Sequence, residues 1–444
     1  DTVVYGSNHS SFYWSTQFSN LLLPDNMDCG VIPAFGMYIA LIWEIFGRSI
    51  QTSHLAMLPF ALGIVYQLYI LSKKFIKPEF AGITSLLVLA DPTILSQVTL
   101  VSPDVPLVFF FLLGTNSLIE NKKALLTLSI LALFLINTRG LLLSFCLLIL
   151  DLYCNIDFKN KWRKIFISLV KRSLIYLPAL AIFIIYNFYH YSQKGWVFTH
   201  EDSPWANTHK VVNSKEFLFN IGLLGWRMMD YGKVIIWIIF LGFLFTFKKQ
   251  TFRLKQTRLL FFYILCILIF VHIDMLWANN LLAHRYFMPL NITFSFLTAT
   301  VLFSDMTSKK TKYILTFLWF NILISGNFWK YPPKIAQGWD STLAHLPYYN
   351  LRHEAIEYLD QHNINFKEVG SFFPNVASFD KLDLNNDNRN FNNFDKKMTY
   401  VFYSNVYNIE DNVYEEITDK NKYIPIKKFE NKGIYIIIYK KNPK

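Results

Sequence analysis

Long apolar runs recur along the first three quarters of this 444-residue chain and constrain its fold more than any other feature. Most are about 17–25 residues long, the length that an α-helix needs to cross a bilayer. A helix also satisfies its own backbone hydrogen bonds in lipid. The runs are continuous rather than alternating in polarity, which argues against a transmembrane β-barrel. We therefore expect an all-α polytopic membrane protein.

We predict ten spans, which lie near residues 52–71, 80–100, 103–120, 123–138, 140–155, 166–189, 231–247, 259–276, 285–304 and 312–329. The segment 31–47 is apolar but short, and it contains Glu44. Residues 1–30, which precede it, contain no Lys or Arg. We interpret 31–47 as a juxtamembrane helix that lies in the membrane interface. We also expect a further transmembrane helix before Asp1, so that Asp1 is not the native N-terminus.

The connections between the spans alternate sharply in charge. Nineteen lysines and arginines fall near residues 73–77, 122–123, 159–172, 248–258 and 309–312. The positive-inside rule places these five connections in the cytoplasm. They also account for the formal net charge of +12, which in a soluble protein would favour a nucleic-acid partner. The region 1–51, the loop at 190–230 and everything after residue 330 are then exoplasmic.

The composition changes after residue 330. The stretch 347–363 has helical spacing of its apolar residues. The segments FKEVGSFF, MTYVFYSN and GIYIIIYKK are predicted as strands because they are rich in aromatic and β-branched residues. We therefore divide the chain into an exoplasmic loop with a juxtamembrane helix (1–51), a transmembrane bundle (52–330) and a small exoplasmic α/β domain (331–444).

Ionisable residues near the span ends gather on the predicted exoplasmic side. Charged groups at membrane depth are costly and by default indicate function. They are Asp1, Asp28, Asp91, Asp104, Arg139, Arg227, Asp230, Asp274 and Arg285. A transporter usually places such groups near the membrane midplane, where no clear pair is found in this sequence. The arrangement favours chemistry at the outer membrane interface, on a substrate with a lipid tail and a polar head.

Several segments in a fixed order carry a family resemblance. They are DTVVY (1–5), MDCGVIPAFGMYIALIWEIFG (27–47), the span that begins HLAMLPFALGIVYQLYIL, LADPTILSQVTLVSPDVPLVFF (89–110), LALFLINTRGLLL (131–143) and AHRYFMPLN (283–291). Over roughly residues 1–330 the chain resembles the GT-C membrane glycosyltransferases, in particular the protein O-mannosyltransferases and the lipid A aminoarabinose transferase. The resemblance implies a GT-C type bundle. It also implies transfer of a sugar from a polyprenyl-phosphate carrier to an acceptor at the exoplasmic face, with inversion.

The resemblance assigns the acidic residues. Asp1 matches the first acidic residue of the Asp-Glu motif in the first exoplasmic loop, although Thr2 stands where Glu is often found. The Pro-Pro element of the family is reduced to Ile32-Pro33. Asp104 matches the acidic residue after the third family span. Glycosyl transfer needs a carboxylate that takes the proton of the attacking hydroxyl, and Asp1 is our candidate, with Asp104 orienting Asp1 or the acceptor.

The resemblance also assigns the basic residues. Arg139 stands where the family often has Lys or Arg after Asn/Thr, and Arg285 matches a basic residue before Tyr and Pro. Arg binds phosphate oxygens in a fork, so these two arginines are predicted to hold the donor phosphate, together with His284. Candidate acceptor-site or loop residues are Asp28, Tyr5 and Arg227.

Plainer roles exist for most of these residues. Asp104 follows a proline and opens a span, so it also fits an N-cap. Arg139 also fits a tight turn, and Arg285 also fits an interface anchor. The residues His9, His200, Glu201 and Asp202 match no strong metal motif, so no metal site is predicted. No cofactor is identified, and a divalent cation stays an open alternative.

Two other functions compete with a glycosyltransferase. A polytopic transporter or lipid flippase has no need of Asp and Arg clustered at one face, and a membrane scaffold that presents 331–444 has no need of basic residues at exoplasmic helix ends. We expect a polyprenyl-phosphate-linked sugar donor and membrane lipid as partners, and no nucleic acid. A composition rich in Lys, Asn, Ile and Phe points to a bacterium, hence to the inner membrane with the active site facing the periplasm. The sequence leaves the sugar and the acceptor (protein, lipid or glycan) open.

Overall fold

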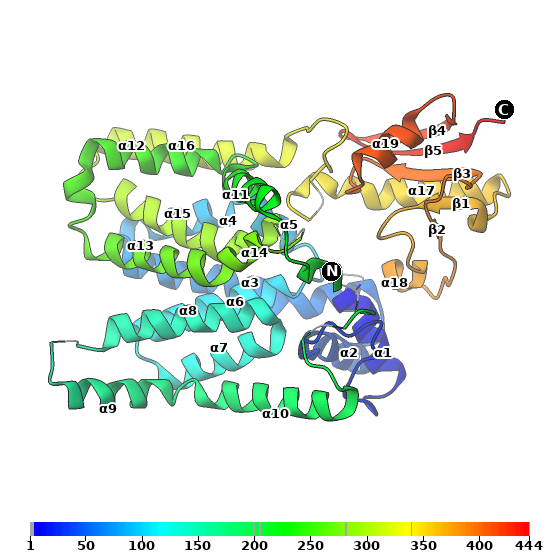
Figure 1. The fold of residues 1–444 in the computed structure, drawn as a ribbon. Coiled ribbons are helices and arrows are strands. Elements are labelled where there is room, and N and C mark those ends of the chain that lie inside the picture. The colour runs from blue at the N-terminus through cyan, green and yellow to red at the C-terminus, as the bar shows by residue number, and fades with distance from the viewer. Residues whose placement is uncertain are drawn as a thin grey trace.

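The computed structural model describes residues 4–157, 159–198, 200–203, 206–279, 282–338 and 340–443. It consists of a large helical bundle followed by a small C-terminal α/β domain (Figure 1). This confirms the predicted fold class of an α-helical protein with apolar helices and a small C-terminal domain. The first three residues lie outside the described part, and Asp1 is one of them.

The bundle helices follow the predicted apolar runs. They are α3 (Ile50–Phe75), α4 (Pro78–Leu89), α5 (Pro92–Gln97), α6 (Asp104–Ile119), α7 (Lys123–Ile136), α8 (Thr138–Asn155), α9 (Trp162–Ser173), α10 (Leu177–Lys194), α12 (Val234–Thr251), α13 (Lys255–Ile267), α14 (Ile273–Leu276), α15 (Met288–Leu302) and α16 (Lys309–Ser325). Four described helical segments are long and apolar enough to cross a membrane, namely α3, α8, α12 and the segment Lys255–Leu276. The division into ten spans stays a prediction.

The predicted span 166–189 is two helices rather than one. The helices α9 and α10 meet at 55°, and together they would make a fifth apolar span. Pro178 lies in the first turn of α10, where a backbone N–H has no partner within the helix, so the missing N–H of proline costs nothing. In the middle of one continuous helix the same proline would remove a backbone hydrogen bond. Arg172 lies in the last turn of α9 and binds Asp151 of α8, which fixes the break against the bundle. The bend therefore follows from the sequence just before residue 178.

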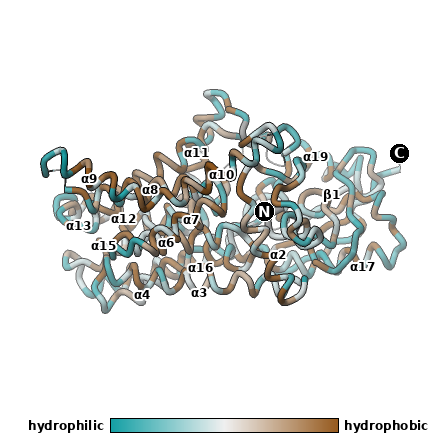
Figure 2. Tube along the Cα trace, turned by 90° about the horizontal axis from the view of Figure 1, so that it is seen from below, coloured by the Kyte–Doolittle hydropathy of each residue, from teal (hydrophilic) through white to brown (hydrophobic). Residues whose placement is uncertain are grey.

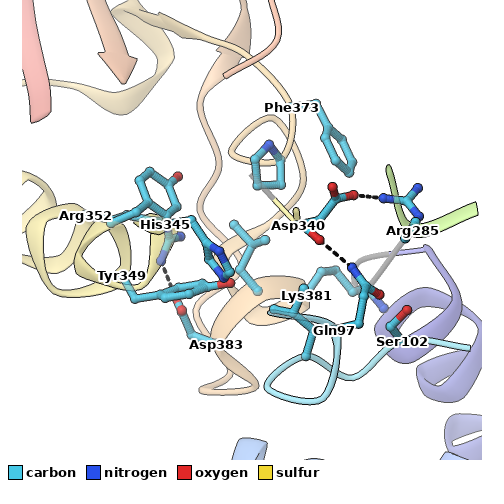
Figure 3. Close-up of a pocket in the computed structure, with 14 residues that line it drawn as sticks. Gln97, Ser102, Arg285, Asp340, His345, Tyr349, Arg352, Phe373, Lys381 and Asp383 are labelled. Atoms are coloured by element: carbon cyan, nitrogen blue, oxygen red, sulfur yellow. Dashed lines mark hydrogen bonds and ion pairs between the residues drawn. The ribbon is translucent and has the colours of Figure 1, made fainter. Parts of the chain in front are cut away.

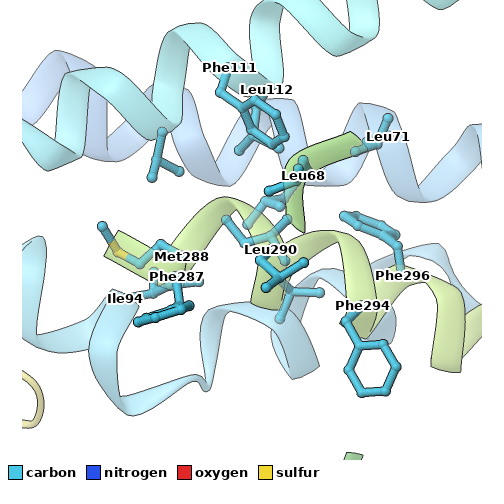
Figure 4. Packing of buried hydrophobic residues seen from close by; sticks show 14 of the residues in the cluster. Leu68, Leu71, Ile94, Phe111, Leu112, Phe287, Met288, Leu290, Phe294 and Phe296 are labelled. Atoms are coloured by element: carbon cyan, nitrogen blue, oxygen red, sulfur yellow. The ribbon is translucent and has the colours of Figure 1, made fainter. Parts of the chain in front are cut away.

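The centre of the bundle is α15, all fifteen residues of which are buried. Leu290 and Phe296 of α15 pack among Leu68 of α3 and Phe111 and Leu112 of α6 (Figure 4). In a membrane this packing stabilises the bundle by van der Waals contact more than by the hydrophobic effect, because lipid tails are as apolar as these side chains.

The two ends of the bundle differ in chemistry. At one end the Lys-rich connections contact each other, since Lys77 lies 2.5 Å from Asp305 and Lys74 lies 2.8 Å from Glu120. Figure 2 shows this far end, beside α9 and α13, as hydrophilic next to largely hydrophobic helices. The N-terminal segment and the C-terminal domain lie at the opposite end (Figure 1). The bundle ends are thus divided as the charge pattern predicts, and the side of the membrane on which each lies stays a prediction.

The N-terminal segment forms η1 (Val4–Asn8), α1 (His9–Ser15) and α2 (Ala34–Phe46). The predicted helix is therefore present as α2, and its juxtamembrane position stays a prediction. Gly36 allows α1 to lie directly on α2, because a Cβ at this position would come within 2.5 Å of the Cβ of His9. The predicted exoplasmic loop 190–230 contains a helix that we did not predict, α11 (Ser214–Met229), which begins with a capping box of Asn213 and Glu216.

The C-terminal domain has its own core and a five-stranded sheet in the order β2-β1-β3-β5-β4. Its elements are α17 (Pro347–Gln361), β1 (Val369–Ser371), α18 (Phe379–Asp383), β2 (Asn392–Asn393), β3 (Tyr400–Ser404), α19 (Asp411–Thr418), β4 (Tyr423–Asn431) and β5 (Ile434–Lys441). The strand β1 is parallel to β2 and β3, whereas β5 is antiparallel to β3 and β4. The predicted strands are β1, β3 and β5. The edge strand β4 was missed because Pro425 and several lysines interrupt its pattern.

Candidate active site

Two arginines bind one buried carboxylate, and this group lies at the bundle end nearest the C-terminal domain. Asp104 lies in the first turn of α6, and its side chain is fully buried. Arg139 Nη1, from the first turn of α8, lies 2.5 Å from Asp104 Oδ1, and Arg285 Nε lies 3.3 Å from Asp104 Oδ2. A carboxylate this deep needs such partners, because unpaired burial of a charge is very costly. The structure thus brings three of the predicted site residues together.

The ring of Tyr286 supports both guanidinium groups. The guanidinium carbon of Arg139 lies 4.0 Å from the ring centroid, and that of Arg285 lies 4.9 Å from it. Both separations are within the range of cation–π attraction. The short helix η4 (His284–Phe287) carries Arg285 and Tyr286 in adjacent positions, so this turn positions the whole group.

A segment after the bundle closes the group. Arg285 contacts Asp104 through Nε, and its Nη1 binds the carboxylate of Asp340 (Figure 3). Asp340 adopts a left-handed backbone conformation with φ near 50°, which Asp tolerates better than most residues. Gln97 at the end of α5 donates to the Asp340 carbonyl at 2.7 Å. We did not predict a role for Asp340, because no motif or periodicity distinguishes the segment in which it lies.

His284 belongs to a second buried group that adjoins the first. His284 Nε2 lies 2.9 Å from Asp230 Oδ2, and the hydroxyl of Ser341 lies 3.0 Å from His284 Nδ1. Tyr331 donates a hydrogen bond to Asp230. Arg227, another predicted site residue, lies 3.4 Å from His284 Nε2 and donates to a backbone carbonyl at 3.0 Å. Ser341 follows Asp340 in the chain, so the two groups are continuous.

The two ionisable partners in this second group have shifted pKa values. Burial lowers the pKa of His284 to about 3, despite the hydrogen bond to Asp230. Burial alone would raise the pKa of Asp230, but hydrogen bonds from His284 and Tyr331 outweigh it and lower the pKa. The pair is therefore a neutral imidazole beside an ionised carboxylate. Neutral His284 therefore donates to Asp230 and accepts from Ser341 in this structure, and its role at the donor phosphate stays a prediction.

Of the remaining predicted residues, Asp28 joins neither group. Asp28 is buried with His190 at 3.0 Å and Lys194 at 2.7 Å, where it fixes the end of α10 to the N-terminal segment. The side chain of Tyr5 and all of Asp1 lie outside the described residues. Their predicted roles therefore stay predictions. In the described ranges no cluster of three or more His, Cys, Asp or Glu side chains could hold a metal ion.

Two hollows open beside the two groups. The first lies between the bundle and the C-terminal domain, and has a volume of about 90 Å³. Its walls include Arg285 and Asp340 on one side and α17 on the other (Figure 3). The second is a wider groove of about 810 Å³ between α11 and residues 329–331, which follow the last bundle helix. Apolar residues such as Trp226 and Trp329 line most of it, and Asp230 lies in its wall.

The arrangement offers two chemical capabilities. Two arginines aimed at one point can bind an oxyanion such as a phosphate, because each guanidinium presents a fork of donors. The nearby carboxylates can accept a proton from a hydroxyl if the group that holds them is displaced. Arg285 and Asp340 line the hollow beside the C-terminal domain, whereas Asp230 lines the apolar groove.

Comparisons with known proteins complete this description. No protein family matches the chain, and no curated protein matches it. Two solved structures are similar to it, both of ArnT from Cupriavidus metallidurans. The apo structure has a TM-score of 0.47 and 13% identity over 99% of this chain and 93% of that chain. The structure bound to undecaprenyl phosphate has a TM-score of 0.46 and 14% identity over 71% of this chain and 57% of that chain.

Proposed function

We propose that this protein is an integral-membrane glycosyltransferase that moves a sugar from a polyprenyl-phosphate carrier to an acceptor at the exoplasmic face, with inversion. One observation carries the proposal. Arg139 and Arg285 converge on Asp104 at the bundle end that bears the C-terminal domain. A lipid-linked phosphate at the membrane surface would meet both guanidinium groups there.

The charges around Arg285 explain how the site would accept a phosphate. Arg139 and Arg285 are balanced by Asp104 and Asp340, so the group has no net charge. Asp104 is fully buried between both arginines, whereas the Asp340 side chain is 15% exposed and contacts only Arg285 among them. A phosphate is therefore expected to replace Asp340 on Arg285 and to leave Asp104 in place. This exchange keeps the group balanced by one anion for each cation.

The groove between α11 and residues 329–331 is the expected place for the prenyl tail. It is lined mainly by apolar residues, with Trp226 and Trp329 among them. Tryptophan is favoured at the membrane–water interface, where one part of its ring is apolar and the other is wet. The groove also contains Asp230, whose partner His284 precedes Arg285 in the chain. A tail in this groove would place its phosphate near the arginines.

The chemistry needs a proton acceptor but no acid. The acceptor oxygen bonds to the anomeric carbon while the bond from that carbon to the phosphate oxygen breaks, and the phosphate leaves with the electron pair. The acceptor proton passes to a carboxylate. The resemblance assigns this carboxylate to Asp1, and displacement by phosphate would free Asp340 for the same task. The variants Asp1→Asn and Asp340→Asn distinguish these two candidates. The variant that has lost the base should no longer transfer the sugar but should still bind undecaprenyl phosphate.

Binding of undecaprenyl phosphate tests the donor site. The purified protein in nanodiscs should bind undecaprenyl phosphate and should not bind undecaprenol, which lacks the phosphate. Arg139→Gln and Arg285→Gln should each weaken binding by about 2–5 kcal/mol, the loss expected when one partner of a largely desolvated charge pair is removed. Arg389→Gln is the matched control, because Arg389 lies in the C-terminal domain and pairs with Asp360 and Asp387. Equal binding of the lipid alcohol and the lipid phosphate would refute the donor assignment.

A further inference from the structure

The helix α9 (Trp162–Ser173) lies at the bundle end opposite the C-terminal domain and presents a face that the proposed function does not use (Figure 1). We propose that this face binds the negatively charged lipid headgroups of the membrane leaflet at that end. The proposal is independent of the glycosyltransferase function, because it involves neither the arginine group nor the apolar groove.

One row of apolar side chains on α9 faces away from the bundle. Trp162, Phe166 and Val170 are spaced four residues apart, so they lie on one side of the helix. They are 78%, 57% and 44% exposed, whereas a row that packed on the bundle would be buried. Trp162 stands in the first turn of α9, and tryptophan is favoured where hydrocarbon meets water. The row therefore fits the acyl-chain side of a membrane interface.

Cations without counter-ions lie beside this row. Arg163, Lys164 and Lys171 are exposed, and within the described ranges the side chain of none of them forms a hydrogen bond or an ion pair. Asp157 is the only acidic residue in α9 and in the connection before it, and it binds the side chain of Asn160. The helix thus presents three uncompensated positive charges beside an apolar row.

The fourth cation of α9 fixes which way the helix faces. Arg172 is buried, and its Nε lies 2.9 Å from Asp151 Oδ2 of α8. Its Nη1 also donates to the side chain of Asn121 at 2.7 Å. Asp151 is fully buried, so breaking this pair would leave an uncompensated charge in the bundle. The pair holds one side of α9 on the bundle, and the apolar row and the free cations face outward as a result.

The depth of α9 fits the surface of a leaflet. The helix α10, which follows it, has 18 residues and is about 27 Å long at about 1.5 Å per residue, close to the hydrocarbon thickness of about 30 Å. The helix α9 leaves the direction of α10 at an angle of 55°. Four cations among its 12 residues are too costly for hydrocarbon, so α9 belongs in the interface. Interfacial helices that bind anionic lipid typically have Trp and Phe on one side and Lys and Arg on the other.

Charge and apolar surface together identify the partner as lipid. Two other lysines at this bundle end already have partners, because Lys77 pairs with Asp305 and Lys74 pairs with Glu120. The free cations of α9 attract an anionic headgroup, and each basic residue near such a surface adds to the attraction. A zwitterionic headgroup has no net charge to offer. A free phosphate ion would leave the apolar row uncovered, whereas an anionic lipid supplies both the charge and the acyl chains.

The test places a fluorophore on α9 and measures which lipid lies beside it. Phe166→Cys, in an otherwise cysteine-free full chain, carries the dye NBD. The protein is placed in phosphatidylcholine nanodiscs that contain a small fraction of nitroxide-labelled phosphatidylglycerol, or the same fraction of nitroxide-labelled phosphatidylcholine. We expect the quenching to show phosphatidylglycerol enriched about fivefold over phosphatidylcholine beside α9. Salt at about 1 M should remove the enrichment, because it shortens the range of electrostatic attraction to about 3 Å.

Charge variants test the origin of the enrichment. The combination of Arg163→Gln, Lys164→Gln and Lys171→Gln should lose it, whereas Arg163→Lys with Lys164→Arg and Lys171→Arg should keep it. The matched control removes the same charge from three exposed lysines of the C-terminal domain, which form no ion pair with a described residue. It should keep the enrichment, and it combines Lys397→Gln, Lys420→Gln and Lys432→Gln.

The proposal is wrong if the two nitroxide lipids quench equally, because α9 then does not select an anionic headgroup. It is also wrong if the enrichment survives the loss of the three α9 cations, or if the control variant loses it as well, because the attraction then belongs to another part of the chain or to its net charge. Enrichment that persists at high salt would show that charge does not hold the lipid. None of these results involves undecaprenyl phosphate or sugar transfer, so they are distinguishable from failure of the proposed function.

Discussion

Replacing Asp104 by Asn keeps the shape of the side chain and removes the one charge that both arginines share. Asp104 is fully buried, and the side chains of Arg139 and Arg285 are only 17% and 11% exposed. Solvent therefore screens these ion pairs much less than it screens surface pairs. Removing one partner of a buried pair typically costs about 3–5 kcal/mol, because the other charge stays buried and unpaired. We expect a loss of this size, borne mainly by Arg139, since Arg285 keeps Asp340.

The same change should act differently on the phosphate complex. Without Asp104 the two guanidinium groups lose one of their two carboxylate partners. A bound phosphate supplies a new anion and so restores part of the lost electrostatic stabilisation. Undecaprenyl phosphate should therefore stabilise Asp104→Asn more than it stabilises the unmodified protein. Ligands that bind only the folded state raise its apparent stability by mass action, so this difference is measurable.

The assay is equilibrium unfolding in mixed micelles, with and without undecaprenyl phosphate. Asp104→Asn, Arg139→Gln and the double variant form a cycle. The double variant should lose less free energy of unfolding than the sum of the single losses, because residues in contact are coupled. Additive losses, or an Asp104→Asn protein as stable as the unmodified one, would show that Asp104 does not hold the arginines and would refute the reasoning.

Two further predictions follow from the buried histidines and from the charge pattern. Burial lowers the pKa of His284 to about 3 and that of His9 to about 4. Below about pH 6.5 the unfolded chain therefore binds protons at these histidines that the folded protein does not bind. The unfolding temperature should fall as the pH drops from about 6.5 to 4, and an unfolding temperature that does not change with pH would contradict this. The second prediction concerns the topology and uses cysteines placed at the exposed residues Ser19 and Asn412 in a cysteine-free background. Both cysteines should react with an impermeant maleimide added outside intact cells, whereas Lys249→Cys should not react. The opposite labelling pattern would show that the predicted topology is inverted.

The sequence anticipated those parts of the site that lie at span ends. Asp104, Arg139 and Arg285 each sit within a few residues of a turn between apolar runs, and the alternation of charge places those turns at one end of the bundle. Because helices in a bundle are roughly parallel, residues at the same end are brought close together. This physical rule works without knowledge of which helices are neighbours.

The rest of the site depends on docking that no local pattern encodes. Asp340 lies in an irregular segment after the bundle, and α17 belongs to a different domain, so only the packing of these parts on the bundle brings them to Arg285. The assignment of His284 shows the same limit, since its pKa depends on burial and on Asp230, which lies 54 residues away in the chain. By contrast, α11 was predictable, because the capping box of Asn213 and Glu216 is a local signal that can be read from the sequence.

Cleavage of a lipid-linked sugar tests the central claim most directly. Proteoliposomes should contain the protein, a total cell-envelope extract as the source of acceptor and radiolabelled undecaprenyl-phosphate-linked sugars. They should release undecaprenyl phosphate and transfer the label with inverted anomeric configuration. Arg139→Gln and Arg285→Gln should lose this release, and Arg389→Gln should keep it. Movement of the intact lipid-linked sugar across the bilayer without cleavage would contradict the account and would instead identify a lipid flippase.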